Sequence, residues 1–285
     1  MFTMLFSSVA IDATLAQQGI AVVYVVATVS ICIIKVFKPL NNLLLYGKSV
    51  DLKNTSSITD WVGSLTVPKH WFGHYYISLV VYVLALQHID LSRFFVVSMI
   101  SSPSVYRQLK LVQYCLLAQG IRRTIESYWV SKPGPRARMN ICHYALGMAH
   151  YFLIAAHTAI SLLQSQPGPL APTAMEVVLV AAFVAASLMQ LINHHHLSTL
   201  VKYSVPDFWV VSCSHYLNEI EIYLVLAVIA CKQSTSNWMI PLNYVVCLVF
   251  VIVNLSISSI ETHKFYQRKF PREFKLKWSI IPGVL

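Results

Sequence analysis

The sequence predicts an all-α integral membrane protein with about seven transmembrane helices, six if the third apolar stretch does not cross. Charged residues make up only 11% of the 285-residue chain, whereas a soluble domain carries about 25%. Hydrophobic residues make up 56% of the chain, and the mean hydropathy is +0.62. The charged residues are too few to form the polar surface of a soluble domain of this length. A disordered chain is also excluded, because it would contain fewer aromatic and aliphatic residues.

The apolar stretches that predict these helices are each near the length of about 20 residues that crosses a bilayer core. The third is the least regular, because Pro103, Arg107 and Lys110 lie inside it. This leaves open a re-entrant or bent helix that is buried in protein. The predicted spans are 17–37, 72–89, 94–121, 141–163, 175–196, 209–231 and 238–260.

The net charge of +10 is explained by membrane topology. If the first 16 residues lie on the lumenal side, the loops 35–71, 122–138, 198–208 and 261–285 face the cytoplasm and contain 17 of the 21 Lys and Arg residues. This asymmetry follows the positive-inside rule, and it predicts a lumenal N-terminus and a cytoplasmic C-terminus. A nucleic-acid partner is not needed to explain the basic excess.

The cysteines and the N-terminus exclude two other classes. The six cysteines lie in or beside apolar runs and show no CxxC spacing, so neither a disulfide scaffold nor a zinc site is predicted. The N-terminal segment lacks a basic stretch before its apolar run, and we expect it to be retained as the first helix. Residues 1–285 are expected to form a single membrane domain.

Histidines are numerous for so apolar a chain, with eleven in total. Several gather at helix ends on the predicted cytoplasmic face, where a water-soluble cofactor can meet a membrane-dissolved substrate. An ionisable group at bilayer depth is a functional hint, although a single interfacial histidine is more often an anchor. His88, His150 and His157 lie deeper or toward the lumenal side and receive no role. The grouped positions are His70 and His74, His194 to His196, His215 with Glu219 and Tyr223, and His263 with Tyr266.

Two chemistries suit such a cluster. Metal chemistry is disfavoured, because membrane di-iron enzymes need histidine boxes that include HxxHH, which the chain lacks. Hydride transfer from a nicotinamide cofactor would need polar side chains at the cytoplasmic helix ends to hold the pyrophosphate, since no GxGxxG motif is present. Composition alone does not choose this second chemistry. The residues placed for it are Arg122, Arg123, Asn193, His194, Lys202 and His263.

Several motifs resemble the steroid 5α-reductase family, and specifically its polyprenol/polyprenal reductase branch, which serves dolichol synthesis. Residues 67–76 read VPKHWFGHYY, residues 119–126 read QGIRRTIE, residues 190–206 read QLINHHHLSTLVKYSVP, and residues 213–223 read CSHYLNEIEIY. The C-terminal ETHKFYQRKF resembles the family's ending, and together the segments cover residues 67–282 in order. Ser214, the additional His195 and His196, and Glu221 depart from the family pattern.

The resemblance implies an NADPH-dependent oxidoreductase of the endoplasmic reticulum membrane. Its expected reaction reduces the α-isoprene double bond of polyprenal, on the route to dolichol and protein N-glycosylation. The substrate is then a long-chain polyprenyl lipid in the bilayer, and no metal is implied. The resemblance assigns catalysis to His74, Tyr75, Tyr76 and His263. It assigns cofactor binding to Arg122, Arg123, Asn193, His194, Lys202, His215, Glu219 and Tyr266.

Three alternatives stay open at this point. A steroid or trans-2-enoyl reductase of the same fold would share the cofactor site and differ in substrate shape. An isoprenylcysteine methyltransferase-like enzyme has a related membrane architecture but uses S-adenosylmethionine. A non-enzymatic seven-helix receptor would share the topology without needing the cluster of His, Glu and Arg. The polyprenyl length and any protein partner are not predicted.

Overall fold

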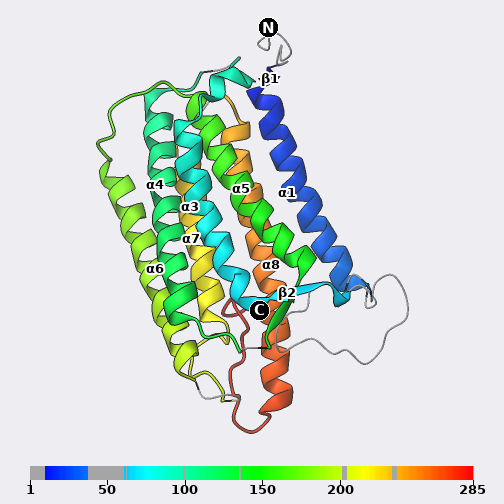
Figure 1. Ribbon diagram of the computed structural model, residues 1–285. Helices are drawn as coiled ribbons and strands as arrows, with labels where there is room; N and C mark the ends of the chain where they lie inside the picture. The colour runs from blue at the N-terminus through cyan, green and yellow to red at the C-terminus, as the bar shows by residue number, and fades with distance from the viewer. Residues whose placement is uncertain are drawn as a thin grey trace.

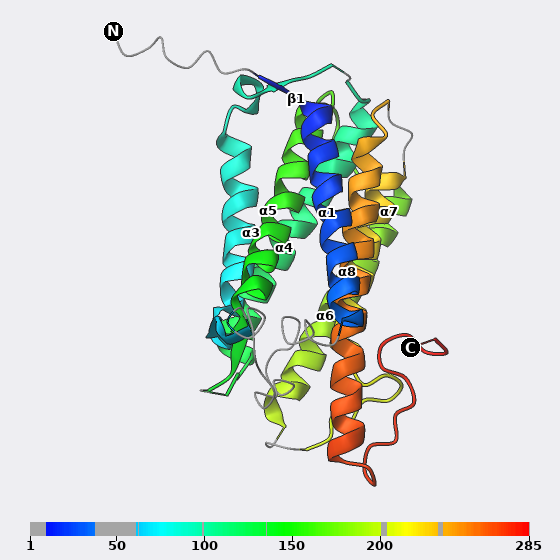
Figure 2. The ribbon, with the colours of Figure 1, turned by 90° about the vertical axis from the view of Figure 1, so that its right-hand side faces the viewer.

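The computed structural model describes residues 10–37, 61, 63–98, 100–134, 136–200, 204–232 and 236–284. Seven helices of 17 residues or more lie in this part of the chain and run side by side as one bundle (Figures 1 and 2). They are α1 (Ala13–Val36), α3 (Phe72–His88), α4 (Pro103–Ile125), α5 (Ile141–Leu163), α6 (Ala174–Thr199), α7 (Ser214–Cys231) and α8 (Met239–Lys269).

Helix α1 begins at a side-chain cap, and most of its residues are apolar. Asp12 accepts hydrogen bonds from the backbone N–H groups of Thr14 (2.8 Å) and Leu15 (3.1 Å). The bond from Leu15 lowers the pKa of the Asp12 carboxyl, because it stabilises the charged form. Asp12 also ends strand β1 (Ile11–Asp12), which pairs in parallel with β3 (Phe95–Val96) after the 3-10 turn η4 (Leu91–Arg93). The cap and the strand fix where the first helix starts.

Helices α3 and α5 both begin at a two-stranded sheet. Strand β2 (Thr66–Pro68) pairs antiparallel with β4 (Arg138–Asn140), with Val67 opposite Met139. A 3-10 turn, η3 (Lys69–Trp71), leads from β2 into α3. The Asn140 side chain accepts from the Cys142 N–H (2.8 Å) and caps α5. The sheet therefore brings the starts of α3 and α5 together.

Helix α4 corrects the third predicted span. The prediction began at residue 94, but β3 (Phe95–Val96) and a bridge from Ser101 to Ser165 come first, and the helix starts at Pro103. Proline suits the first helical position, where its missing N–H is not needed. The helix is continuous from Pro103 to Ile125, through the polar residues Arg107 and Lys110. A π-helical turn, η5 (Glu126–Val130), follows it directly.

The polar residues of the third span are paired with neighbouring side chains. Arg107 forms an ion pair with Glu176 at 3.1 Å, and Lys110 donates to Gln113 at 3.0 Å. Glu176 is fully buried, closes a capping box with Thr173 at the start of α6, and also lies 3.6 Å from Nζ of Lys232. These pairs explain how charges are tolerated inside α4.

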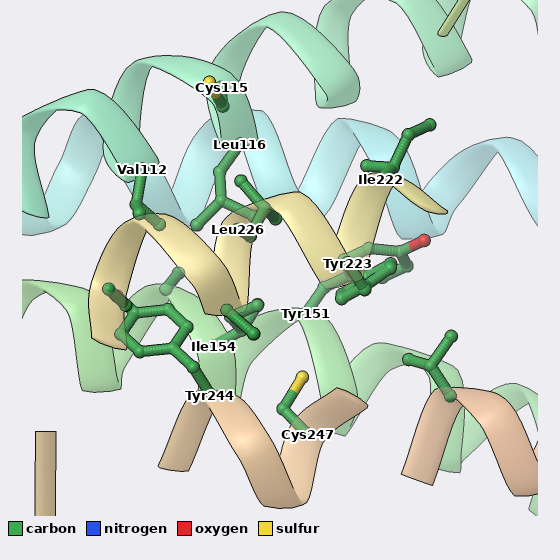
Figure 3. Packing of buried hydrophobic residues seen from close by; sticks show 14 of the residues in the cluster. Val112, Cys115, Leu116, Tyr151, Ile154, Ile222, Tyr223, Leu226, Tyr244 and Cys247 are labelled. Carbon is green, nitrogen blue, oxygen red and sulfur yellow. The ribbon is translucent and has the colours of Figure 1, made fainter. Parts of the chain in front are cut away.

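The core is shared by helices that are distant in the sequence. Helix α6 packs on α7, α1 on α8, and α3 on both α4 and α5. Figure 3 shows apolar and aromatic side chains of α4, α5, α7 and α8 meeting at the centre, among them Leu116, Ile154, Leu226 and Tyr244. Helix α7 contacts α4, α6 and α8.

The all-helical membrane class is confirmed in its coarse form. Five of the described helices, α1, α5, α6, α7 and α8, are long and apolar enough to cross a membrane. Helix α3 has 17 residues, and α4 carries Arg107, Lys110, Arg122 and Arg123. The span prediction for α5 is matched at both ends, whereas α8 continues nine residues beyond the predicted 260 to Lys269.

One end of the bundle collects most of the described basic residues, and we call it the basic end. Helices α1, α4, α6 and α8 finish there, and α3, α5 and α7 begin there (Figure 1). Four basic residues lie toward the opposite end: Arg93, Arg107, Lys110 and Lys232. The basic end also holds the polar clusters described below.

Candidate active site

A cluster of buried charges lies at the basic end, where α4 meets α6. Arg122 and Arg123 occupy the last turn of α4, and both guanidinium groups donate to the carboxylate of Glu126. Nδ1 of His194, on α6, lies 2.7 Å from the same carboxylate. The Glu126 side chain is only 1% exposed. A carboxylate so deeply buried needs such partners, because a lone buried charge is strongly disfavoured.

A second carboxylate, Glu219 on α7, joins this cluster through two glutamines. Gln119 donates to both Glu219 oxygens at 3.3 Å, and Gln190 donates to one of them. The oxygens of Gln119 and Gln190 each accept from Nη2 of Arg122 at 2.6 Å. The amides therefore connect Arg122 to Glu219, and the two arginines are matched by two carboxylates.

Gln119, Glu126 and Gln190 were missing from the predicted site residues, although all three lie in the motif segments. Gln119, Arg122, Arg123 and Glu126 have the spacing i, i+3, i+4, i+7, which places them on one helix face. That periodicity was the available signal. The prediction included Arg122 and Arg123 from this face but not Gln119 and Glu126, which lie one turn to either side of them.

Tyr76 reaches the cluster from α3. Nη2 of Arg123 donates to the Tyr76 hydroxyl oxygen at 2.7 Å, and Cζ of Arg123 lies 4.6 Å from the ring centroid. Tyr76 is 4% exposed. A guanidinium in this position stabilises the phenolate form of the tyrosine.

The other two predicted catalytic residues of α3 lie apart from this cluster. Nδ1 of His74 is 3.1 Å from the Tyr144 hydroxyl, and its ring packs against Trp71. Tyr75 stacks on Tyr144 and donates to the backbone carbonyl of His143 at 3.3 Å. Successive residues of a helix differ in direction by about 100°, so Tyr75 and Tyr76 face different neighbours.

The predicted cofactor residues of α6 and α7 meet beside the charged cluster. Asn193 donates to Asn218 at 2.7 Å, and Asn218 donates to Glu221 at 2.9 Å. Through these two hydrogen bonds, Glu221, which had no predicted role, is connected to Asn218 and Asn193. The rings of His194 and His215 are 5.5 Å apart. Lys202, also predicted to bind the cofactor, lies outside the described residues.

His263 and Tyr266 form a third group, on the last turns of α8. Nδ1 of His263 is 2.9 Å from the Ser212 hydroxyl, and its ring contacts Phe274. Tyr266 stacks on Phe274 at a centroid distance of 5.6 Å. The segment after α8 folds back here, since backbone bonds join Ser212 to Trp278 (3.1 Å) and Cys213 to Ser279 (3.0 Å). The start of α7 therefore lies between the charged cluster and the His263 group.

Several polar atoms of the cluster fit a bound polar ligand. Among the described residues, Nε of Arg122, Nε of Arg123 and Nδ1 of His215 are buried without a hydrogen-bond partner. Buried donors are normally satisfied, so such atoms commonly mark a place for a ligand or water. Together with the amides of Asn193 and Asn218, these donors suit the phosphates and carboxamide of a nicotinamide dinucleotide. No three His, Cys, Asp or Glu residues in the described part are grouped to hold a metal ion.

The sequence matches the profile of the 3-oxo-5-alpha-steroid 4-dehydrogenase family over residues 137–285, more than half of the chain. The chain belongs to this family. The matched region includes α5 to α8 and the C-terminal segment, and with them His194, Glu219 and His263. Family membership confirms the resemblance that the motifs indicated.

Relatives of this family member cover nearly its whole length. A polyprenal reductase of Saccharomyces cerevisiae is 29% identical and aligns over 90% of this chain and 92% of its own. Proteins with the same name from Caenorhabditis elegans and Danio rerio are each 25% identical, over 85% and 86% of this chain. The two alignments cover 86% of the Caenorhabditis elegans protein and 87% of the Danio rerio protein.

Proposed function

We propose that this family member catalyses the NADPH-dependent reduction of the α-isoprene double bond of a polyprenal. One observation carries the proposal: relatives named polyprenal reductase from a yeast, a worm and a fish align over 85% or more of the chain. The family name also describes chemistry at a carbon–carbon double bond near a carbonyl. An apolar chain with five candidate membrane spans suits a substrate dissolved in the bilayer.

The aldehyde is the chemically favoured substrate. In an α,β-unsaturated aldehyde, a hydride adds at the β-carbon while negative charge develops on the carbonyl oxygen. An acid near that oxygen stabilises the developing enolate, which is the main lever that a protein has on this step. An allylic alcohol offers no such acceptor for the electrons.

We assign the acid to Tyr76 among the four predicted catalytic residues. Its hydroxyl is buried and accepts a hydrogen bond from Arg123, so the phenolate formed on proton donation is stabilised in place. Tyr75 instead donates its hydroxyl proton to a backbone carbonyl, and His74 pairs with Tyr144. These two residues support α3 against α5.

We propose that His263 acts beside a set of residues that hold NADPH. These residues are Arg122, Arg123, Asn193, His194, Lys202, His215, Glu219 and Tyr266. When bound, NADPH supplies the hydride. The arginines would bind its phosphates in competition with Glu126, which already occupies both guanidinium groups. His263 is held by Ser212 and by Gln267, whose Nε2 is 2.9 Å from the His263 Nε2.

We further propose that all seven described long helices cross the membrane, with the basic end in the cytoplasm. The four basic residues at the opposite end contrast with the many at the basic end, as the positive-inside rule requires. This orientation places the N-terminus in the lumen and opens the cofactor residues to cytoplasmic NADPH. The endoplasmic reticulum is the membrane in which dolichol is made.

Substrate profiling tests the proposal against its alternatives. Purified protein is supplied with NADPH and, in parallel, with a polyprenal, a 3-oxo-4-ene steroid or a trans-2-enoyl thioester. We expect turnover with the polyprenal and a product saturated in its α-isoprene unit. Preference for the steroid or the thioester would assign a sister activity. Thermal stabilisation by S-adenosylmethionine but not by NADPH would indicate a methyltransferase, and stabilisation by neither would favour a receptor.

A further inference from the structure

Two tyrosine rings lie against glycine residues near the start of α3. A Cβ atom on Gly147 of α5 would lie 2.7 Å from Cε1 and Cζ of Tyr75. A Cβ atom on Gly73 of α3 would lie 2.6 Å from Cε2 of Tyr128, a residue of η5. Carbon atoms in contact are normally about 3.5 to 4.0 Å apart. Any side chain at either glycine would therefore force the tyrosine ring or its helix to move.

The ring of Tyr75 has little freedom to move. It is 3% exposed, stacks on Tyr144 at 5.5 Å and meets Phe72 edge-on at 4.8 Å between ring centroids. Its hydroxyl donates to the His143 carbonyl at 3.3 Å. Gly147 lies one turn along α5 from His143 and Tyr144, so these three residues share the helix face that receives the ring. A methyl group on Gly147 would therefore displace α3 itself by about 1 Å.

The place of Tyr75 determines where Tyr76 points. Successive residues of a helix differ in direction by about 100°, so Gly73 and Tyr75 are about 160° apart around α3, and Tyr76 points between them. In that direction its hydroxyl accepts from Arg123 at 2.7 Å. Helix α3 lies beside both α4 and α5 (Figure 2) and also contacts η5. A turn of α3 about its axis is opposed by Tyr75 against α5 on one side and by Tyr128 on the other.

We propose that Gly147 is a positioning residue of the reductase, which acts through Tyr75. Because Gly147 lacks a side chain, it admits the Tyr75 ring to the surface of α5. The ring in turn fixes the rotation of α3 at which the Tyr76 hydroxyl meets Arg123. The acid then stands beside its stabilising charge before the substrate arrives, as preorganised catalysis requires. This inference rests on the proposed role of Tyr76 as the acid.

Glycine at this position needs a reason of this kind. Inside a helix, glycine is less favourable than alanine, because it loses more conformational freedom on folding. The Tyr75 ring supplies the reason at Gly147, whereas the Cβ position of Gly19, inside α1, has nothing within 4 Å. Gly73 makes the weaker of the two contacts, because Tyr128 is 47% exposed and has room to turn.

A matched control lies at the opposite end of the bundle. A Cβ atom on Gly168, in the loop between α5 and α6, would lie 2.5 Å from Cβ of Pro103. This clash is as close as the one at Gly147, but Pro103 starts α4 at the end far from Tyr76. A general loss of packing therefore affects both alanine variants, whereas a loss of the Tyr76 orientation affects only Gly147→Ala.

The test compares Gly147→Ala, Gly168→Ala and Gly19→Ala in the full-length protein, by steady-state kinetics with a polyprenal and by thermal shift with and without NADPH. We expect Gly147→Ala to lower kcat by about tenfold or more, because a catalytic group displaced by about 1 Å can lose about 100-fold in rate. NADPH binding and its KM should stay unchanged. The two control variants should keep kcat within about twofold, since distant sites act independently.

A double-mutant cycle shows whether the ring carries the effect. Leucine lacks the Cε1 and Cζ atoms that meet the added methyl group, so in a Tyr75→Leu background Gly147→Ala should change kcat by about twofold or less. Tyr75→Phe keeps both atoms and should give no relief. If Gly147→Ala does not fold by itself, the double variant should fold as Tyr75→Leu does. A double variant that also fails to fold would mean that the methyl group clashes elsewhere, and the inference is then wrong.

Three kinetic results would overturn the inference. They are a wild-type kcat in Gly147→Ala, equal losses of kcat in Gly147→Ala and Gly168→Ala, and a loss that persists in the Tyr75→Leu background. Tyr76→Phe separates this failure from a failure of the proposed function. If Tyr76→Phe stays active, the assignment of the acid is wrong. If Tyr76→Phe is inactive and Gly147→Ala matches the wild type, only the positioning role is wrong.

Discussion

The guanidinium of Arg123 donates a hydrogen bond of 2.7 Å to the hydroxyl oxygen of Tyr76. Arg123 comes from the end of α4 and Tyr76 from the first turns of α3, so the bond joins two helices at the basic end. The same guanidinium is bound by Glu126, which prevents it from turning away. The pair thus combines a proton donor with a fixed positive charge that stabilises its conjugate base.

The first prediction concerns that pair. Tyr76→Phe removes the only acidic proton of the side chain and is expected to lower kcat by about 100-fold or more, the usual worth of general acid catalysis. Tyr75→Phe is the matched control, because its hydroxyl faces the His143 carbonyl. Steady-state kinetics with a polyprenal check both variants. Equal activities for the two would contradict the assignment.

The second prediction concerns His263 and Glu219, two residues of the proposed site. His263→Ala is expected to abolish NADPH oxidation, and Glu219→Gln to reduce it about tenfold through the loss of a charge-assisted hydrogen bond. His195→Ala is the control, since His195 is exposed on α6. Unchanged turnover in both His263→Ala and Glu219→Gln would remove the proposed site.

The third prediction is about stability. Glu126→Gln leaves the buried Arg123 and the partly buried Arg122 without their carboxylate and should lower the free energy of unfolding by about 3 kcal/mol. Glu261→Gln breaks the Lys35–Glu261 pair, whose side chains are 24% and 19% exposed. A more exposed pair is expected to contribute about 1 kcal/mol or less. Thermal unfolding in detergent compares the two, and a larger loss for Glu261→Gln would be inconsistent with the charge arrangement described above.

The fourth prediction is the orientation in the membrane. An N-glycosylation acceptor inserted in the loop 166–172 should be modified, because that loop lies at the end opposite the basic end. An acceptor inserted in the loop 131–138 should stay unmodified. The shift in gel mobility reports both results. The reverse pattern would place the basic end in the lumen.

Hydrophobic patterning was enough to predict most of the fold. Helix α5 coincides with its predicted span, and the other apolar helices differ by at most five residues at their ends, except α8, which ends nine residues later than predicted. The prediction of the third span was wrong at its start, because the apolar residues from 94 onward suggested a helix. In the structure, β3 pairs with β1, and the helix begins only at Pro103. Such strand pairing depends on residues about 80 positions apart, beyond any local pattern.

The site was only partly predictable, for a related reason. Motif residues such as Arg123 and His194 do meet, at 2.7 Å between Nη1 and Nδ1. The sequence did not indicate that Tyr76 and not Tyr75 faces them, since both neighbours are aromatic and buried. His150 was set aside for its depth in the membrane. Its contacts with Tyr24 and Tyr223 come from α1 and α7, which only the folded bundle brings together.

The most direct test of the proposed reaction follows one hydrogen atom. NADPH labelled with deuterium at the transferred position is incubated with the purified protein and a polyprenal, and the product is analysed by mass spectrometry and NMR. We expect an aldehyde whose α-isoprene unit is saturated, with one deuterium at the former β-carbon and a hydrogen from solvent at the α-carbon. Deuterium at the aldehyde carbon, with the double bond intact, would contradict the account, and so would a product without deuterium.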